Sequence, residues 1–297
     1  MGIIEKIAEK TPDRIVSVLK KPVIVGKHNL MLGISPIRNR LYPRKFQAFC
    51  LGLPRTGTAS IAGMFRKRYR AEHEPENIYT TEKIIDYIKG YINERQMISF
   101  IKKRDKCLWL EVESSHFLYF FIDILLNEFE DAKFIFMIRD CYSWLNSYID
   151  HQLGRPLSLK TGFWKKLRDI YFNNNFKYSE EEQILSKHGL YTIDGYLSRW
   201  KRYNEEILSL VPKDRLMIIR TFEIDRNIEN IEKFLDIPAN SLNRSKLHLN
   251  KRTKGFDLLS KIDKKFLKKK FDFYCKDLMK TYYPELFKID YGIRKEK

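Results

Sequence analysis

Short apolar runs alternate along the chain with stretches in which apolar residues recur every three or four positions. The short runs have the length of buried strands and are bounded by glycine, proline or charged residues, so they predict strands over 46–52, 71–74, 107–112, 133–138 and 216–220. The helical spacing predicts helices over 59–68, 81–104, 117–129, 141–151, 191–210 and 228–235. This alternation indicates an α/β fold: a single domain with a central, mostly parallel sheet flanked by helices.

Two parts of the chain are less regular, the amino-terminal segment and residues 154–190. Residues 1–44 combine an amphipathic stretch over 3–19 with loops predicted around Pro36 and Pro43. This pattern is compatible with a lid, a dimer arm or a surface helix. We therefore divide the chain into an N-terminal leader or arm, 1–44, and one domain, 45–297, in which 154–190 is interpreted as an insertion or lid.

The composition is that of a globular and strongly basic protein. Of the 297 residues 43% are hydrophobic, and the formal net charge is +18. A basic surface attracts phosphates, whether in nucleic acid, an anionic membrane or a phosphorylated cofactor. Apolar runs such as Phe117 to Leu126 are shorter than the roughly 20 residues of a membrane span, and early charges argue against a secretory signal. The four cysteines lie far apart, so we expect a cytoplasmic protein with reduced thiols, no transmembrane segment and no metal site.

The first candidate for phosphate binding is the loop after the first predicted strand, Leu53 to Ser60. Gly57 lets the backbone turn sharply, and the amides that open the following helix point to one place, with the positive end of the helix dipole behind them. Arg55 adds a permanent charge with several donors. Hydroxyl groups come from Thr56, Thr58 and Ser60. The loop lacks the first glycine and the lysine of the Walker A motif, so it predicts an anion-binding loop of another kind.

A second candidate follows the strand predicted over 133–138. Arg139 stands at the end of this strand, and Ser147 lies two turns into the next helix. Ser143, Ser147 and His151 are spaced four residues apart, so they share one face of that helix. We therefore expect Arg139 and Ser147 to reach one anion together.

These two loops resemble the cofactor-binding loops of the sulfotransferases that use 3′-phosphoadenosine 5′-phosphosulfate (PAPS). Pro54-Arg55-Thr56-Gly57-Thr58 is similar to their 5′-phosphosulfate loop, Pro-Lys/Arg-Ser/Thr-Gly-Thr-Thr/Ser, although Ala59 replaces the common second threonine. Arg139 and Ser147 reproduce the spacing of the arginine and serine that hold the 3′-phosphate in this family. A later basic segment resembles, more weakly, the carboxy-terminal loop that closes over the same phosphate, through Lys251, Arg252, Lys254 and Gly255.

The resemblance covers roughly residues 46–290 and implies a sulfotransferase fold, related to P-loop proteins. It implies PAPS as donor, adenosine 3′,5′-bisphosphate (PAP) as product, and no metal. Residues 154–190 lie outside it, and we interpret them as an acceptor-side insertion or lid. The implied donor contacts are Arg55, Thr56, Gly57, Thr58, Ala59, Ser60, Arg139, Ser147, Lys251, Arg252, Lys254 and Gly255, with Arg55 also acting in catalysis.

The general base is expected on the segment after the first helix, residues 71–76. Cytosolic sulfotransferases use a histidine, whereas tyrosylprotein and heparan N-sulfotransferases use a glutamate on this segment. The resemblance implies Glu74 as the base, with Glu72 or His73 as alternatives. Alternate residues of a strand share a face, so Glu72 and Glu74 are expected to point together and His73 away. His151 resembles a histidine of the heparan N-sulfotransferases and is a further catalytic candidate.

Glu111, Glu113 and His116 follow another predicted strand and are our candidates for acceptor binding. If these glutamates converge with Glu72 and Glu74, the pocket is acidic and suits a cationic or polyhydroxylated acceptor. We therefore expect sulfuryl transfer to a hydroxyl or amino group of a small polar or cationic molecule, such as a natural product or a sugar. The expected enzyme is a monomer or homodimer.

Two other functional classes would explain some features of the sequence. A non-catalytic nucleic-acid or phosphate-binding protein explains the charge, but no recognition-helix, zinc-finger or RNP-like motif is present, and we expect no specific nucleic-acid partner. A nucleotide kinase is disfavoured because the Walker A lysine is missing.

Overall fold

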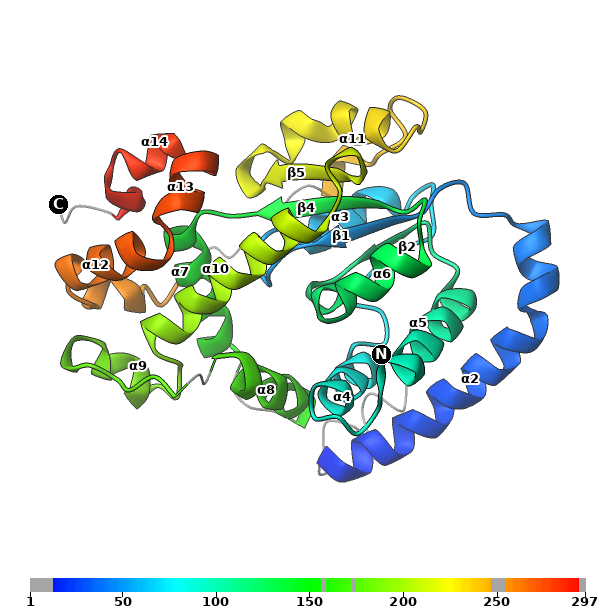
Figure 1. Ribbon diagram of the computed structural model, residues 1–297, viewed down its shortest axis with the longest axis horizontal. Coiled ribbons are helices and arrows are strands. Elements are labelled where there is room, and N and C mark those ends of the chain that lie inside the picture. The colour runs from blue at the N-terminus through cyan, green and yellow to red at the C-terminus, as the bar shows by residue number, and fades with distance from the viewer. Residues whose placement is uncertain (1–12, 156–158, 173–174, 247–254, 294–297) are drawn as a thin grey trace.

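The computed structural model describes residues 13–155, 159–172, 175–246 and 255–293. Its centre is a five-stranded sheet in which paired strands run parallel, in the order β2-β3-β1-β4-β5 (Figure 1). The strands are β1 Ala48–Leu51, β2 Ala71–His73, β3 Val112–Ser114, β4 Lys133–Ile138 and β5 Leu216–Arg220. The predicted α/β fold with a central parallel sheet is confirmed.

Alternate residues of the central strands enter two separate hydrophobic cores. Phe49 and Leu51 of β1 pack into one core, and Ala48 and Cys50 pack into the other. Because successive side chains of a strand point to opposite faces, a strand covered on both sides needs apolar residues at every position. This requirement explains the continuous apolar runs in β1 and β4.

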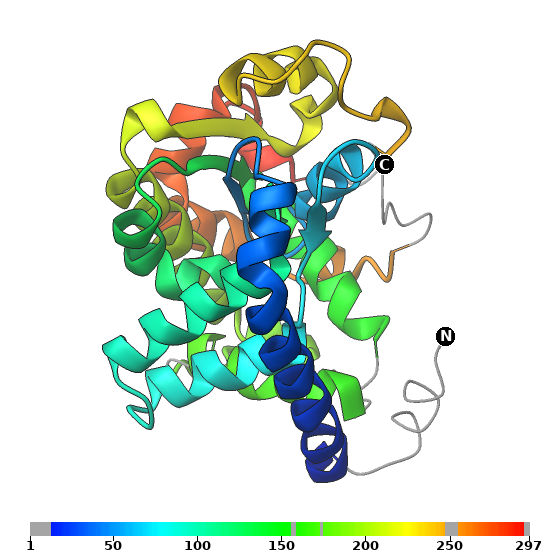
Figure 2. The ribbon, with the colours of Figure 1, turned by 90° about the vertical axis from the view of Figure 1, so that its right-hand side faces the viewer.

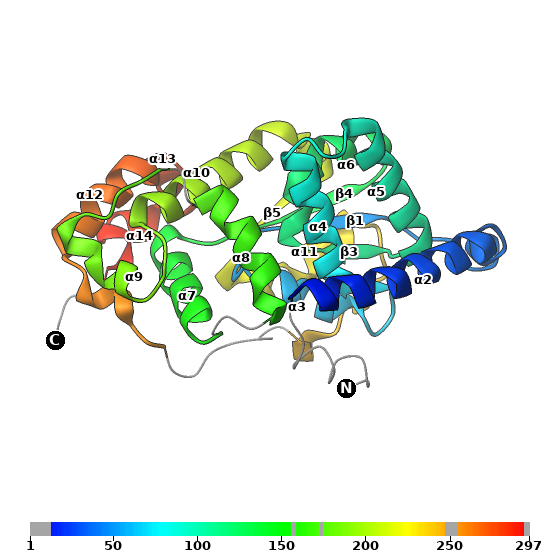
Figure 3. The same cartoon turned by 90° about the horizontal axis from the view of Figure 1, so that it is seen from below.

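Helices cover both faces of the sheet. One face packs against α3 (Thr58–Phe65) and α11 (Ile228–Phe234). The other face carries the larger core, and Figure 3 looks at the molecule from this side. Its helices are α4 Asn77–Ile88, α5 Glu94–Leu108, α6 Ile122–Glu128, α7 Cys141–Leu153, α8 Leu159–Phe172, α9 Gln183–Lys187, α10 Ile193–Leu210, α12 Lys264–Tyr274, α13 Lys276–Tyr282 and α14 Pro284–Phe287. None of the helices in the described ranges has the length and apolar character needed to cross a membrane.

The helix predicted over 81–104 is wrong in its extent, because two helices, α4 and α5, occupy this region. The chain turns at Gly90, which has a positive φ of 72°. A new helix then begins after Asn93, whose side chain accepts a hydrogen bond from the amide of Gln96 in a capping box.

The strand predicted over 107–112 is also wrong. Cys107 and Leu108 end α5, and Trp109, with a φ of 51°, terminates that helix. The strand in this region is β3, Val112–Ser114. A short apolar run at the end of a helix has the same sequence pattern as the start of a buried strand. The pattern therefore could not distinguish the end of α5 from the start of a strand.

Within the amino-terminal segment, one long helix, α2 Asp13–Leu41, passes through Pro36, where we predicted a loop (Figure 2). A proline inside a helix leaves the carbonyl four residues earlier without its backbone donor, here that of Leu32. The hydroxyl of Ser35 donates to this carbonyl at 3.0 Å and replaces the lost bond. Arg38 joins α2 to the end of α5 by donating to the carbonyl of Cys107 at 3.0 Å.

Candidate active site

The loop between β1 and α3 is a closely packed turn. Arg55 and Gly57 both have positive φ angles, 75° and 103°, and glycine adopts such angles without steric cost. A Cβ on residue 57 would also lie 2.8 Å from Cδ1 of Ile224. The indole of Trp144 donates to the carbonyl of Pro54 at 3.0 Å. These contacts hold Arg55 at the carboxyl end of β1.

Arg55 meets the second predicted phosphate-binding segment directly. Its Nε donates to Oγ of Ser147 on α7, 3.1 Å away. Arg139, at the end of β4, donates from Nη1 to the carbonyl of Arg55 and from Nε to Oγ of Ser143, each at 2.9 Å. Since β1 pairs with β4, the two arginines come from adjacent strands. The two separate loops of the sequence therefore form one site.

Arg55, Arg139 and Ser147 line one cavity of about 820 Å³. This volume lies within the range of roughly 300–1,000 Å³ that is usual for ligand sites. Of the three aspartates in the wall, Asp140, Asp150 and Asp257, the first two accept hydrogen bonds from backbone amides. Asp140 accepts from the amide of Ser143 at 2.8 Å, and Asp150 accepts from the amide of Phe256 at 2.9 Å. The two guanidinium groups are thus well placed to bind an anion.

The positive charge of the buried Arg139 is only partly compensated by negative charge in the protein. Desolvation lowers the pKa of its guanidinium from the ordinary value, and the neighbouring carboxylate of Asp140 opposes this shift only in part. Asn146, in the same wall, has a buried side-chain oxygen without a hydrogen-bond partner among the described residues. A ligand that supplies an anion to Arg139 and a hydroxyl or amino donor to Asn146 fits this cavity.

Gly255 brings the carboxy-terminal segment against the same cavity. A Cβ at this position would lie 2.3 Å from Oδ2 of Asp150, so only a residue without a side chain allows this approach. Gly255 lies in the cavity wall. The other predicted contacts of this segment, Lys251, Arg252 and Lys254, lie outside the described residues.

The remaining polar residues of the first loop make contacts inside the protein that stabilise the turn. Thr56, Thr58 and Ser60 are buried. The hydroxyl of Thr56 donates to the carbonyl of Leu53 at 2.8 Å, and Oγ1 of Thr58 lies 3.1 Å from Nε2 of His73. The threonine hydroxyls that we expected to contact the donor therefore have partners within the protein. Besides the guanidinium of Arg55, the amides of Thr58 and Ala59 at the start of α3 are the groups of this loop that would be expected to donate to an anion.

A second polar group lies beside the loop, at the ends of β2 and β3. Oε1 of Glu74 is 2.7 Å from Nδ1 of His116 and 3.8 Å from Nε2 of His73. Burial opposes ionisation of Glu74, but His116, His73 and His151 outweigh it and lower the pKa of the carboxyl to about 2. Because the carboxylate can only accept, Nδ1 of His116 carries the proton in this hydrogen bond.

Glu74, His116 and His151 line a smaller cavity of about 70 Å³ together with Pro54. Pro54 adjoins Arg55, so the carboxylate and imidazole groups lie next to the anion-binding loop. The site can therefore remove a proton close to a bound anion. Within the described ranges, no three His, Cys, Asp or Glu side chains are placed to hold a metal ion.

A comparison with known protein families decides among the functional classes. A family model described as a sulfotransferase domain matches residues 47–244, more than half of the chain. The chain belongs to the sulfotransferase family. The matched range contains both loops that we predicted to bind anions and the Glu74–His116 pair, and it supports sulfuryl transfer as the general activity. No curated protein shows significant sequence similarity to the chain.

In this sulfotransferase Glu72 does not join Glu74. Strand β2 ends at His73, and Glu74 has a φ of 49°, so the chain leaves the extended conformation there. Glu72 is exposed, whereas His73 lies between Thr58 and Glu74. The predicted alternation, with Glu72 beside Glu74 and His73 turned away, is wrong because it assumed an extended backbone through residue 74.

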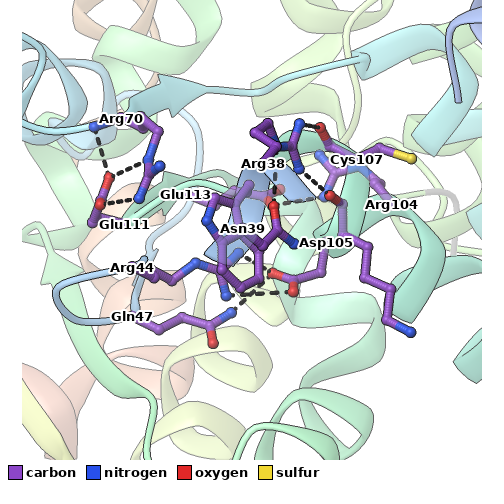
Figure 4. A network of polar contacts seen from close by, with 12 residues as sticks. Arg38, Asn39, Arg44, Gln47, Arg70, Arg104, Asp105, Cys107, Glu111 and Glu113 are labelled. Carbon is purple, nitrogen blue, oxygen red and sulfur yellow. Dashed lines mark hydrogen bonds and ion pairs between the residues drawn. The ribbon is translucent and has the colours of Figure 1, made fainter. Parts of the chain in front are cut away.

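Glu111 and Glu113 are bound to arginines of the scaffold (Figure 4). Glu111 accepts from the amide and from Nε of Arg70, each at 2.9 Å. Glu113 accepts from Nη1 of the buried Arg104 at 2.6 Å. Of the three predicted acceptor residues, only His116 lies beside Glu74. The prediction that four glutamates form an acidic pocket is therefore wrong, and with it the argument for a cationic acceptor.

Sequence reasoning missed several residues of the cavity beside Glu74, among them Arg155, Trp164 and Arg168. Trp164 and Arg168 are four residues apart on α8 and share a face, a signal that could have pointed to them. It also missed Thr221, whose hydroxyl lies 2.7 Å from the carbonyl of Thr56 and 3.0 Å from that of Ile138. Thr221 thereby ties the end of β4 to the anion-binding loop.

Proposed function

We propose that this sulfotransferase uses PAPS as its donor and transfers the sulfuryl group to a hydroxyl or amino group of a small polar acceptor, such as a natural product or a sugar. The observation that carries the proposal is the single cavity lined by Arg55 and Arg139 at the ends of adjacent strands. Arginine binds phosphate through charge-assisted, paired hydrogen bonds, so two arginines in one cavity suit a ligand with two separate anionic groups. PAPS is such a ligand.

We assign the 3′-phosphate to Arg139, with Ser143 and Ser147 beside it, and the phosphosulfate to Arg55 and the first amides of α3. Position supports this assignment, because Arg55 follows Pro54, and Pro54 lines the cavity of Glu74 and His116. When bound, PAPS supplies a sulfuryl group whose bond to the phosphate oxygen breaks as the acceptor oxygen or nitrogen bonds to sulfur.

Arg55 and the positive end of α3 would stabilise the charge that develops on the leaving phosphate. The backbone that carries Arg55 is held before any ligand binds, since Trp144 and Arg139 bind the carbonyls of Pro54 and Arg55. Donors that are already in place need little reorganisation during the reaction. Placement and charge stabilisation are the main contributions that this kind of transfer requires.

We assign removal of the acceptor proton to the pair Glu74–His116. A carboxyl whose pKa is about 2 is a weak base by itself. In its neutral form His116 donates from Nδ1 to this carboxylate and keeps a lone pair on Nε2, which can take the proton of the acceptor. Glu74 then stabilises the imidazolium that forms. His73 and His151 lie close enough to the same carboxylate to lower its pKa further.

Sulfate transfer from radiolabelled PAPS to a panel of phenols, sugars, amines and alkaloids tests the proposal. We expect turnover with at least one acceptor class and inhibition by PAP that is competitive with PAPS. Equilibrium binding of PAP, compared with ATP and magnesium, separates the proposed enzyme from a nucleotide kinase. A protein that binds ATP with magnesium in preference to PAP would contradict the assignment of the donor.

A further inference from the structure

Two neighbouring cavities extend from the Glu74–His116 pair along α7 and α8. The nearer one, of about 70 Å³, has the rings of Tyr148, Trp164 and Tyr171 in its wall, together with Arg155 and Arg168. The second, of about 230 Å³, shares Arg155 and Arg168 with the first and continues to Gln152 and Lys165. Arg155 and Arg168 belong to the walls of both cavities, and we refer to the two adjoining cavities together as the path that leads away from Glu74 and His116.

The residues along this path include buried N–H donors without acceptors. Nε of Arg168, Nε1 of Trp164 and Nε2 of Gln152 are buried and have no hydrogen-bond partner in the part of the chain that the structure describes. The hydroxyl of Tyr196 donates to Oε1 of Gln152 at 2.8 Å, and the hydroxyl of Tyr148 lies close to both Gln152 and Arg168. A buried donor left unpaired costs free energy, and a ligand oxygen removes that cost. Since all three are donors, the complementary ligand is rich in acceptor atoms.

Positive charge predominates in the same walls. The carboxylate of Asp169 is paired with Lys165 at 2.7 Å and also accepts from the hydroxyl of Tyr191 at 2.6 Å. Arg155 and Arg168 are the further cations that the two cavities share. Behind Tyr171, the guanidinium of Arg199 lies 4.7 Å from the ring centre and adds to the positive field. A path of this kind attracts an anion and repels a cation.

We propose that the acceptor carries an anionic group, a carboxylate, sulfate or phosphate, which binds at Arg155 and Arg168 while its hydroxyl or amino group lies at Glu74 and His116. The aromatic rings between these two ends suit a planar apolar portion of the acceptor. The part of this inference that concerns the reacting group rests on the proposed sulfuryl transfer. The anion site itself is inferred independently of the proposed sulfuryl transfer. An anionic acceptor differs from the cationic acceptor that we expected from the sequence. That expectation required Glu111 and Glu113 to line the pocket, and both are instead bound to arginines of the scaffold.

Three phenols that differ only in the charge of one arm test the anion site: 4-hydroxyphenylacetate, 2-(4-hydroxyphenyl)ethanol and tyramine. Their binding to the full chain is measured by calorimetry with saturating PAP, so that the larger cavity is already filled. We expect the carboxylate to bind at least about tenfold more tightly than the neutral phenol, the usual order for a charge-assisted hydrogen bond, and tyramine to bind more weakly than both.

Substitutions then locate the site. Arg168→Gln should abolish most of the carboxylate's advantage and change binding of the neutral phenol by less than about twofold, whereas Arg168→Lys should retain part of it. Arg95→Gln, which removes an exposed arginine of α5, is the matched control and should change nothing. An unchanged PAP affinity verifies folding, and if Arg168→Gln fails to fold, Arg155→Gln serves the same purpose.

Equal binding of the three phenols, tighter binding of tyramine, or a carboxylate preference that survives in both arginine variants would overturn the anion site. These results are independent of turnover. A carboxylate preference without any sulfate transfer would leave the anion site standing and count against the proposed function. Sulfate transfer at equal rates to all three phenols would support the proposed function and count against the anion site.

Discussion

Nη1 of Arg139 donates a hydrogen bond to the backbone carbonyl of Arg55, 2.9 Å away. The side chain that we assign to one end of the donor therefore also supports the loop that we assign to the other end. This contact crosses from β4 to the adjacent β1, at the edge of the sheet where the carboxyl ends of parallel strands meet. It makes the two halves of the proposed donor site depend on each other.

Replacing Arg139 should weaken binding of the donor product. Arg139→Ala removes a charged donor and a support of Arg55, so we expect the Kd of PAP to rise by roughly ten- to a hundredfold. Arg139→Lys keeps the charge but not the fork of donors, and its effect should be smaller. Calorimetry with PAP measures both. Lys213→Ala, an exposed cation at the amino end of β5, should leave the Kd unchanged, and an equal loss there would indicate a non-specific charge effect.

Glu74 and its exposed neighbour Glu72 form a matched pair for testing the base. Glu74→Gln cannot stabilise an imidazolium at His116, so kcat should fall by roughly a hundred- to ten-thousandfold while the Kd of PAP stays constant. Glu72→Gln changes the same residue type two positions away and should retain normal turnover. Steady-state kinetics with PAPS and an accepted phenol measure both variants. If Glu74→Gln keeps near-normal turnover, or if both variants lose it equally, the assignment of the base is wrong.

Much of the proposed donor site could be predicted from the sequence because its parts stand directly after buried strands. The prediction for β4 coincides with Lys133–Ile138, since a strand buried on both faces is an uninterrupted apolar run. Parallel strands bring their carboxyl ends to one edge, so Arg55 and Arg139 could be expected to meet without knowledge of any contact. The cavity that they share is consistent with that expectation.

The acceptor side could not be predicted in the same way, because its geometry depends on contacts between distant residues. Glu111 pairs with Arg70, which is 41 positions away in the sequence, and no local sequence pattern predicts such a pair. The direction of Glu74 depends on a single positive φ that breaks the alternation of the strand. Arg155 and Arg168 reach the site from the segment 154–190, which resembled nothing in the family pattern.

The ionisation of Glu74 should make its contribution to stability depend on pH. Its folded pKa of about 2 lies below the ordinary value of 4.5, because the histidines outweigh the effect of burial. The stabilisation is therefore complete above pH 4.5 and is lost as the pH falls towards 2. Urea unfolding of the wild type and of Glu74→Gln from about pH 6 to about pH 3 should give a difference in unfolding free energy that shrinks on the acid side. A difference that stays constant over this range would contradict the low pKa.

Glu113 should matter for stability and not for binding of ligands. It accepts from Nη1 of Arg104, and both side chains are almost completely buried. Glu113→Ala removes one of two carboxylates beside the guanidinium of Arg104, since Oε2 of Glu76 lies 3.6 Å from its Nε, and the loss should be at most the roughly 3–5 kcal/mol of a broken buried pair. The double variant Arg104→Met, Glu113→Leu removes this pair but also takes the Arg104 charge away from Glu76, so it should recover only part of the loss. Urea unfolding measures the two variants, and calorimetry of the folded protein should give the wild-type Kd for PAP. If Glu113→Ala were instead stable and selectively impaired in acceptor binding, Glu113 would belong to the acceptor site and not to the scaffold.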